Sequence, residues 1–84
     1  PHVVLLDNLD SYFNLEDEIR SRGCDVTIYR NTLSAEYIFE QMQALDKDVL
    51  LLLSPGPGTP SQAGCMMSLI HMCQGVFPIL GICL

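Results

Sequence analysis

The sequence predicts an α/β fold of three layers, in which a mostly parallel sheet is covered by helices on both faces. Short apolar runs alternate with segments of helical periodicity, and the resulting order is βαβαβαβ. The runs are continuously apolar, which is typical of strands buried on both faces, as in parallel sheets. Helices that join consecutive parallel strands form right-handed crossovers, so we expect helices on both faces of the sheet.

The first strand is predicted over residues 3–6, and a helix over residues 11–22 follows. Gly23 is suited to end this helix, because a glycine readily adopts the left-handed conformation found just after many helix C-termini. The acidic run at residues 16–18 is interpreted as a solvated face near the favourable N-terminal end. The apolar face of the helix is formed by Tyr12, Leu15 and Ile19.

A second strand is predicted over residues 26–29, and a third over residues 49–53. The third is the most apolar of the strands, so we expect it to be central. Between the two, Ser34 is suited to cap a helix, since its hydroxyl can accept a hydrogen bond from a free amide of the first turn. The apolar face of this helix is formed by Ala35, Ile38, Phe39, Met42 and Leu45.

The last two elements are a helix over residues 61–73 and a strand over residues 78–82. In open parallel sheets, ligands bind beyond the carboxyl ends of the strands. Residues 7–11, residues 54–60 and the chain after Ile82 meet at that edge. We therefore expect the chemistry of the protein there.

Composition and charge exclude several classes of protein. The chain has 84 residues, of which 49% are hydrophobic and 17% charged, so it has room for one small domain at most and can build a core. A formal net charge of −6 and scattered basic residues argue against a nucleic-acid or anionic-membrane partner. No apolar segment approaches the roughly 20 residues needed to span a bilayer. The N-terminus has no signal-peptide pattern, and the missing initiator Met indicates processing or an incomplete N-terminus.

The four cysteines, Cys24, Cys65, Cys73 and Cys83, form no C-x-x-C pair and have no His at zinc-ligand spacing. We therefore expect neither disulfides nor a structural metal. Cys65 and Cys73 are interpreted as core or half-buried helix positions. Free thiols without a secretion signal favour a reducing compartment, so a cytoplasmic location is expected.

The segment S-P-G-P-G-T-P at residues 54–60 follows a buried strand directly. Prolines fix φ and remove amide donors, whereas glycines allow close backbone approach. The remaining N–H groups at Gly56 and Gly58 can therefore contact a ligand, although a stiff structural turn explains the pattern as well. The segment lacks the Lys and the spacing of a phosphate-binding loop.

Gly81, Ile82 and Cys83 resemble the first half of a nucleophile elbow, a tight turn that exposes a nucleophile above the sheet. A helix after such a turn lowers the pKa of the thiol, and the next amide becomes an oxyanion donor. A buried core cysteine is the alternative. His2 and His71 are interpreted as surface residues rather than general bases.

Together these segments resemble the class I (triad) glutamine amidotransferase family, and within it the glutamine-hydrolysing subunits (component II) of anthranilate synthases. The matching stretches cover essentially the whole chain in order. They are L-L-D-N-L-D-S-Y (5–12), I-Y-R-N (28–31), L-S-P-G-P-G-T-P-S-Q-A-G-C-M (53–66) and P-I-L-G-I-C-L (78–84). The resemblance implies a flavodoxin-like class I amidotransferase fold, here incomplete. Residues 1–84 are then the N-terminal portion of a single amidotransferase domain.

The resemblance also implies roles for individual residues. Cys83 is the nucleophile that attacks the side-chain amide of L-glutamine. Gly56, Pro57 and Gly58 match the glutamine-binding segment, whose amides, with that of Leu84, form the oxyanion hole. No metal and no cofactor are expected in this subunit, and Mg²⁺ is expected only in the partner. That partner is a chorismate-using synthase subunit of a cytoplasmic hetero-oligomer, a lyase that makes anthranilate for tryptophan biosynthesis.

Two departures from the family pattern stand out. The His and Glu of the triad follow the nucleophile at a distance in the family and are absent from these residues, so this piece alone is expected to be inactive. One residue instead of two separates Tyr12 from Asn14.

An aminodeoxychorismate synthase subunit of folate biosynthesis is the close alternative. A non-catalytic flavodoxin-like binding or regulatory module is another, in which Asp7 is an acidic residue of the sheet edge that binds a phosphoryl group or Mg²⁺. Asp7 and Asp10 are otherwise interpreted as residues that cap a helix or form hydrogen bonds within the loop.

Overall fold

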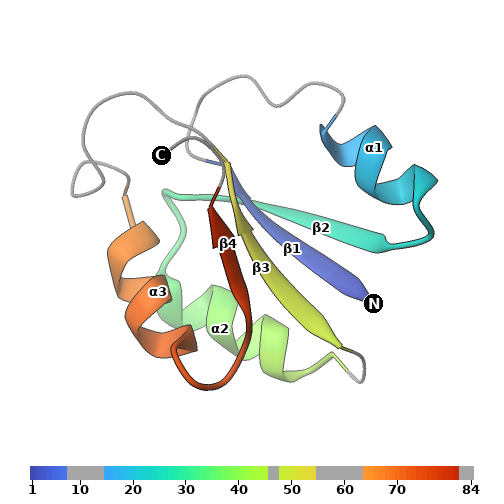
Figure 1. The fold of residues 1–84 in the computed structure, drawn as a ribbon. Helices are drawn as coiled ribbons and strands as arrows, with labels where there is room; N and C mark the ends of the chain where they lie inside the picture. The colour runs from blue at the N-terminus through green and yellow to red at the C-terminus, as the bar shows by residue number, and fades with distance from the viewer. Residues whose placement is uncertain (8–14, 46–47, 55–63, 82–84) are drawn as a thin grey trace.

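The computed structural model describes residues 1–7, 15–45, 48–54 and 64–81. Its four strands are β1 (His2–Asp7), β2 (Asp25–Arg30), β3 (Val49–Leu53) and β4 (Ile79–Gly81). All pair in parallel, in the spatial order β2-β1-β3-β4 (Figure 1). The predicted order of elements and the interior position of the third strand are confirmed.

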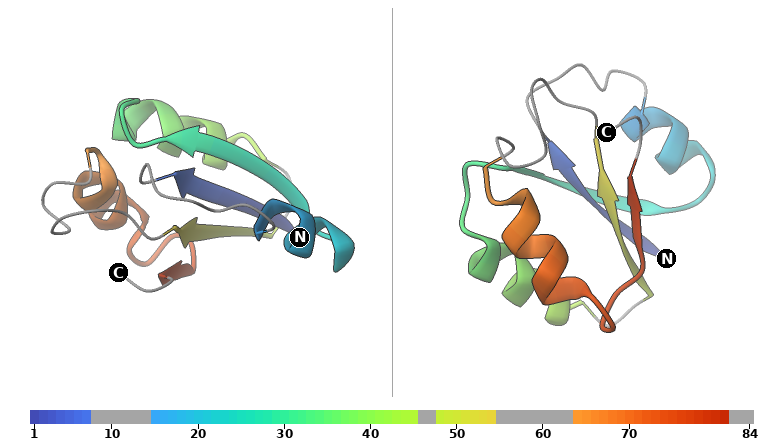
Figure 2. Two further views of the ribbon diagram at one scale, coloured as in Figure 1. Left: turned by 90° about the horizontal axis from the view of Figure 1, so that it is seen from above. Right: turned by 60° about the vertical axis from the view of Figure 1, so that its left-hand side comes forward.

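Helices cover both faces of this sheet, which confirms the predicted three-layer α/β fold (Figure 2). One face carries α1 (Leu15–Ser21), and the other carries α2 (Ala35–Gln43) and α3 (Met66–Cys73). Strand residues alternate between the two faces. The core under α2 and α3 is the larger one, and its fully buried members are Val4, Leu6, Ile38, Met42, Leu51, Met66, Leu69 and Cys73.

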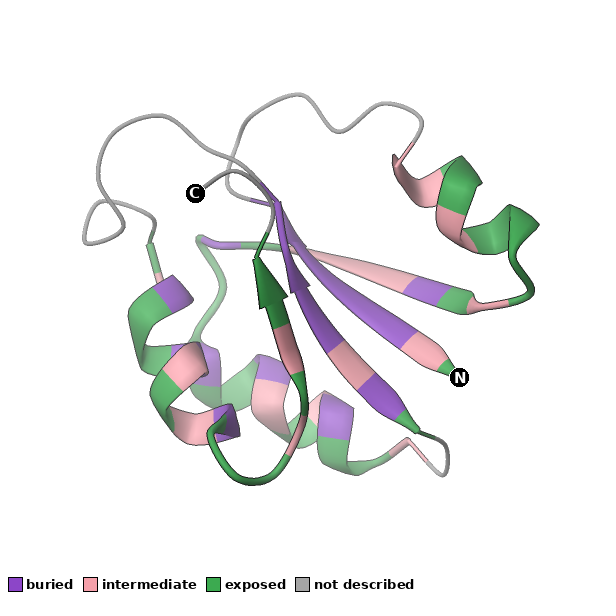
Figure 3. Ribbon diagram, viewed as in Figure 1, coloured by how far each residue is buried: buried purple, intermediate pink, exposed green. Residues whose placement is uncertain are grey.

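The smaller core lies under α1 and contains Val3, Leu5, Val26 and Leu52. No residue of α1 is fully buried, but its predicted apolar residues Leu15 and Ile19 pack against this cluster. Figure 3 shows the resulting contrast between the exposed surface of α1 and the buried interior strands. This helix is therefore the least tightly packed of the three described helices.

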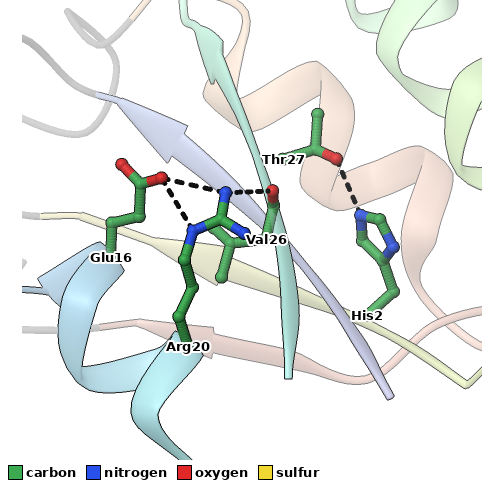
Figure 4. Close-up of polar contacts among 5 residues, drawn as sticks. All are labelled: His2, Glu16, Arg20, Val26 and Thr27. Carbon is green, nitrogen blue, oxygen red and sulfur yellow. Dashed lines mark hydrogen bonds and ion pairs between the residues drawn. The ribbon is translucent and has the colours of Figure 1, made fainter. Parts of the chain in front are cut away.

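Arg20 ties α1 to the neighbouring strand. Its guanidinium donates from Nε to Glu16 Oε2 at 2.9 Å and from Nη2 to the main-chain oxygen of Val26 at 3.1 Å (Figure 4). Alternate residues of a strand form main-chain hydrogen bonds to opposite sides, and the odd-numbered residues of β2 bond to β1. The main-chain oxygen of Val26, an even-numbered residue, therefore points away from β1. Arg20 thus satisfies an acceptor that the sheet leaves open.

Helix boundaries follow the predicted capping residues. Ser34 precedes α2, and its Oγ accepts a hydrogen bond from Tyr37 N at 3.1 Å. Gly23 has φ +85° after α1, and the bonds from Gly23 N to Arg20 O and from Cys24 N to Ile19 O form a Schellman motif. Both capping predictions are confirmed.

The predicted start of the third helix is wrong for residues 64–65, which form a turn before α3 begins at Met66. The reason is local: Gly64 has φ +57°, a left-handed conformation that no α-helix contains. Residues 61–63 and Ile82, which were also predicted helix and strand, lie outside the described residues. None of the helices in the described ranges is long and apolar enough to cross a membrane.

Candidate functional site at the carboxyl ends of the strands

Buried polar residues gather at one edge of the sheet. Asp7 (6% exposed), Asn31 (4%) and Ser54 (0%) are the buried polar residues of the described chain, and each stands at or just after the carboxyl end of a strand. The parallel register brings the three strand ends to the same edge. Burying polar groups costs free energy unless they are hydrogen-bonded, and no buried side-chain N or O atom in the described residues lacks a partner.

Main-chain hydrogen bonds join these strand ends into one unit. Asn31 N donates to Asp7 O at 3.1 Å, and Ser54 N donates to Leu6 O at 3.1 Å. Cys65 N donates in turn to Asn31 O at 2.9 Å. The segment that enters α3 is therefore attached to the end of β2, which is attached to the end of β1.

Gly64 packs directly against Asn31. A Cβ placed on Gly64 would collide with the main-chain oxygen of Asn31 and would lie 2.9 Å from both its carbonyl carbon and its Cγ. Real Cβ atoms essentially never approach that closely. Only a glycine fits this position, for its backbone conformation and for the space it leaves.

The predicted catalytic residue Cys83 lies outside the described residues, and so do the predicted substrate-binding residues Gly56, Pro57, Gly58 and Leu84. So do Asp10, Tyr12 and Asn14.

The described residues next to the S-P-G-P-G-T-P segment and next to Cys83 lie on neighbouring strands. Leu53 of β3 pairs with Gly81 of β4. The chain therefore leaves these adjacent strands at the same edge, with Ser54 leading into the S-P-G-P-G-T-P segment and Gly81 leading into Ile82 and Cys83.

Neither histidine lies at this edge. His2 is at the start of β1, where its Nε2 is 2.7 Å from Thr27 Oγ1 (Figure 4). His71 is exposed in the last turn of α3. From the end of this helix the chain turns towards the start of β4 (Figure 1). Both belong to the opposite end of the strands. His71 is a surface residue as predicted, whereas His2 is half-buried because it is hydrogen-bonded to Thr27.

Two of the described thiols, Cys65 and Cys73, are poor nucleophiles. Burial raises the pKa of Cys73 from 9.0 to about 11, and the side chain is 0% exposed. Burial also raises the pKa of Cys65, with a smaller contribution from the Glu36 carboxylate, while a hydrogen bond to its own backbone opposes the rise. A thiol reacts as the thiolate, so both are largely unreactive at neutral pH. The predicted burial is confirmed for both, but Cys65 lies in the turn before α3 and not in a helix.

The described residues show no metal-binding cluster at this edge, and a surface hollow that they line lies elsewhere. No group of three or more His, Cys, Asp or Glu side chains within these ranges is arranged to hold a metal ion. A surface hollow lies at the opposite edge and is lined by Asp48, Val49, Val76, Phe77 and Pro78.

Two residues of this edge, Asn31 and Gly64, received no role from the sequence analysis. Both occur in stretches that match the family, at the end of I-Y-R-N and within A-G-C-M. The available signals were a polar residue directly after the predicted second strand and a glycine within the predicted third helix.

The comparisons with known proteins agree with this geometry. The family described as "Glutamine amidotransferase class-I" matches residues 4–84. Curated relatives named "Anthranilate synthase component 2" include those of Buchnera aphidicola subsp. Acyrthosiphon pisum, 45% identical, and Vibrio parahaemolyticus, 49% identical, each over 84 residues. The relative from Haemophilus influenzae is 47% identical over 85 residues.

In each case the alignment covers 99% of this chain but only 42–43% of the relative, so the chain spans about two fifths of their length. The matched region nevertheless includes every described element except the first two residues of β1. Because this family matches residues 4–84, the chain belongs to the class I glutamine amidotransferase family.

Proposed function

We propose that this chain is the N-terminal part of a glutamine amidotransferase subunit that hydrolyses L-glutamine to glutamate and ammonia. The observation that carries the proposal is the pairing of Leu53 with Gly81 in a chain of this family. Two segments far apart in sequence, one with the glycines of residues 54–60 and one with Cys83, leave neighbouring strands at one edge. A nucleophile and its oxyanion donors need that proximity.

In the proposed mechanism, the Cys83 thiolate attacks the side-chain amide carbon of glutamine. The negative charge that develops on the amide oxygen is stabilised by main-chain N–H groups of Leu84 and of the Gly56–Gly58 segment. The C–N bond then breaks, ammonia leaves with the proton taken from the thiol, and a γ-glutamyl thioester remains. Water hydrolyses the thioester to glutamate and restores the thiol.

The proton has to pass through a general base. His2 and His71 lie at the other end of the strands, which supports a base supplied by a part of the protein beyond these 84 residues. A His oriented by a Glu is the arrangement that the family resemblance implies. We therefore expect residues 1–84 alone to turn over very little glutamine.

We further propose that the ammonia is delivered to a chorismate-using partner subunit that makes anthranilate, in the cytoplasm. The names of the curated relatives support this product. In this scheme the amidotransferase subunit needs no metal or cofactor, and Mg²⁺ acts only in the partner.

Labelling of the full-length protein tests the reaction. A diazoketone analogue of glutamine should alkylate Cys83 alone among the four cysteines, and peptide mass spectrometry identifies the site. Cys83→Ser should abolish glutamine hydrolysis. Cys24→Ser, at a half-buried thiol just before β2 and at the other end of the strands, is the matched control and should retain it. Equal labelling of all cysteines, or none, would contradict the proposal.

A complex with the partner subunit tests the product. With chorismate present, anthranilate should form from glutamine with the unchanged subunit, and from added ammonium salt with the Cys83→Ser subunit. Formation of aminodeoxychorismate instead would assign the protein to folate biosynthesis.

A further inference from the structure

We propose that Asn31 and Gly64 are positioning residues: they hold residues 64–65, which follow the predicted glutamine-binding segment in the chain, against the end of β2. This inference rests on the proposed function, because it assigns a role to residues that act through the predicted glutamine-binding segment. Neither residue has to touch glutamine. Their contribution is to fix where that segment ends.

The segment is bounded by two anchored positions. On its N-terminal side, Ser54 is fully buried, and its N–H is bonded to Leu6 O. On its C-terminal side, Cys65 N donates to Asn31 O at 2.9 Å. Both acceptors belong to strand ends of the same sheet edge, so the sheet fixes the described residues on either side of the predicted glutamine-binding segment.

Asn31 is suited to be the anchor because it is itself held on its other side. Its N–H donates to Asp7 O, and the residue is only 4% exposed. A displacement of Asn31 would therefore disturb the end of β1 as well. The segment before α3 is attached to an interior part of the fold and not to a free loop.

Gly64 sets the distance of approach. The structure describes two other glycines with positive φ, Gly23 at +85° and Gly75 at +78°, and a Cβ added to either would meet nothing within 4 Å. At Gly64 the same Cβ would collide with the main chain of Asn31. Conformational preference thus explains Gly23 and Gly75, whereas Gly64 also requires the space that a missing Cβ leaves.

This comparison defines a matched pair of variants, Gly64→Ala and Gly75→Ala. Both place an alanine at positive φ, but only the first pushes the chain away from Asn31. Gly75 lies in the turn between α3 and β4, at the opposite end of the strands from the candidate site. Because a misplacement of about 1 Å in a catalytic group can reduce a rate about 100-fold, small shifts at Gly64 should be visible in turnover.

In the full-length protein, Gly64→Ala should lower kcat for glutamine hydrolysis by roughly 10- to 100-fold. Gly75→Ala should change kcat less than about threefold, since it affects only local conformational preference. Alkylation of Cys83 by iodoacetamide is a direct displacement at carbon that needs no oxyanion donors. Its rate should therefore be nearly the same in both variants, which a general loss of structure would not permit.

Hydrogen exchange provides a measurement that does not depend on activity. Peptides covering residues 55–66 should exchange faster in Gly64→Ala than in Gly75→Ala, while peptides from β1 and β3 exchange alike in both. The inference is overturned if the two variants exchange and turn over equally, or if iodoacetamide alkylation falls as much as glutamine hydrolysis. If the unchanged protein does not hydrolyse glutamine, the proposed function fails, and the exchange comparison alone decides the anchoring of the segment.

Discussion

Raising the pH from 8 to 10 should destabilise the protein through Cys73, a thiol that the fold buries completely. Its pKa is about 11 in the folded state against an ordinary value of 9.0. Between these values the unfolded chain has lost the proton and the folded chain still holds it. Stability therefore falls as the pH rises through this window, since the unfolded state binds fewer protons.

The magnitude follows from the two pKa values. A pH of 10 is one unit above the pKa of the thiol in the unfolded chain and about one unit below its pKa in the folded chain. This difference corresponds to about 1.4 kcal/mol of lost stability. At pH 8 both states hold the proton, and the loss is close to zero. The Cys73 contribution is thus present below pH 9 and disappears towards pH 11.

Urea denaturation of the full-length protein at pH 8 and pH 10 measures this loss. Other groups titrate in the same range, so the informative quantity is the difference between the unchanged protein and Cys73→Ala. The unchanged protein should lose about 1.4 kcal/mol more on going to pH 10. An equal loss in both proteins would refute the argument that burial of this thiol raises its pKa.

Three further predictions concern the packing of the helices, and each is measured as a change in unfolding free energy. Leu69→Ala, at a side chain with no exposure in α3, should cost about 2–5 kcal/mol, and a cost below about 1 kcal/mol would contradict the described core. Ser34→Ala should cost about 1 kcal/mol because the first turn of α2 loses its cap, whereas Ser34→Asn should restore most of that loss. Arg20→Ala should cost more than Arg22→Ala, because Arg20 also bonds to Val26 O while Arg22 makes only an exposed ion pair; equal costs would remove the assigned role of that bond.

Local patterns in the sequence predicted the elements that local forces determine. Continuous apolarity identified the strands, and the third of them was predicted over residues 49–53 and observed over Val49–Leu53. Ser34 and Gly23 were assigned as capping residues because a helix end leaves backbone groups that only nearby residues can satisfy. The start of α3 was misplaced because nothing in the local pattern indicates that Gly64 adopts a left-handed conformation.

The sequence by itself therefore determined the α/β class, the order of the elements and, through its resemblance to a family, the residues that carry the proposed chemistry. Only the tertiary structure decided that Asp7, Asn31 and Ser54 share one edge, and that Gly64 rests on Asn31. The physical reason is that parallel pairing joins residues far apart in the chain. Hydrogen bonds such as the one from Cys65 N to Asn31 O form only after the strands have assembled, so no local pattern contains them.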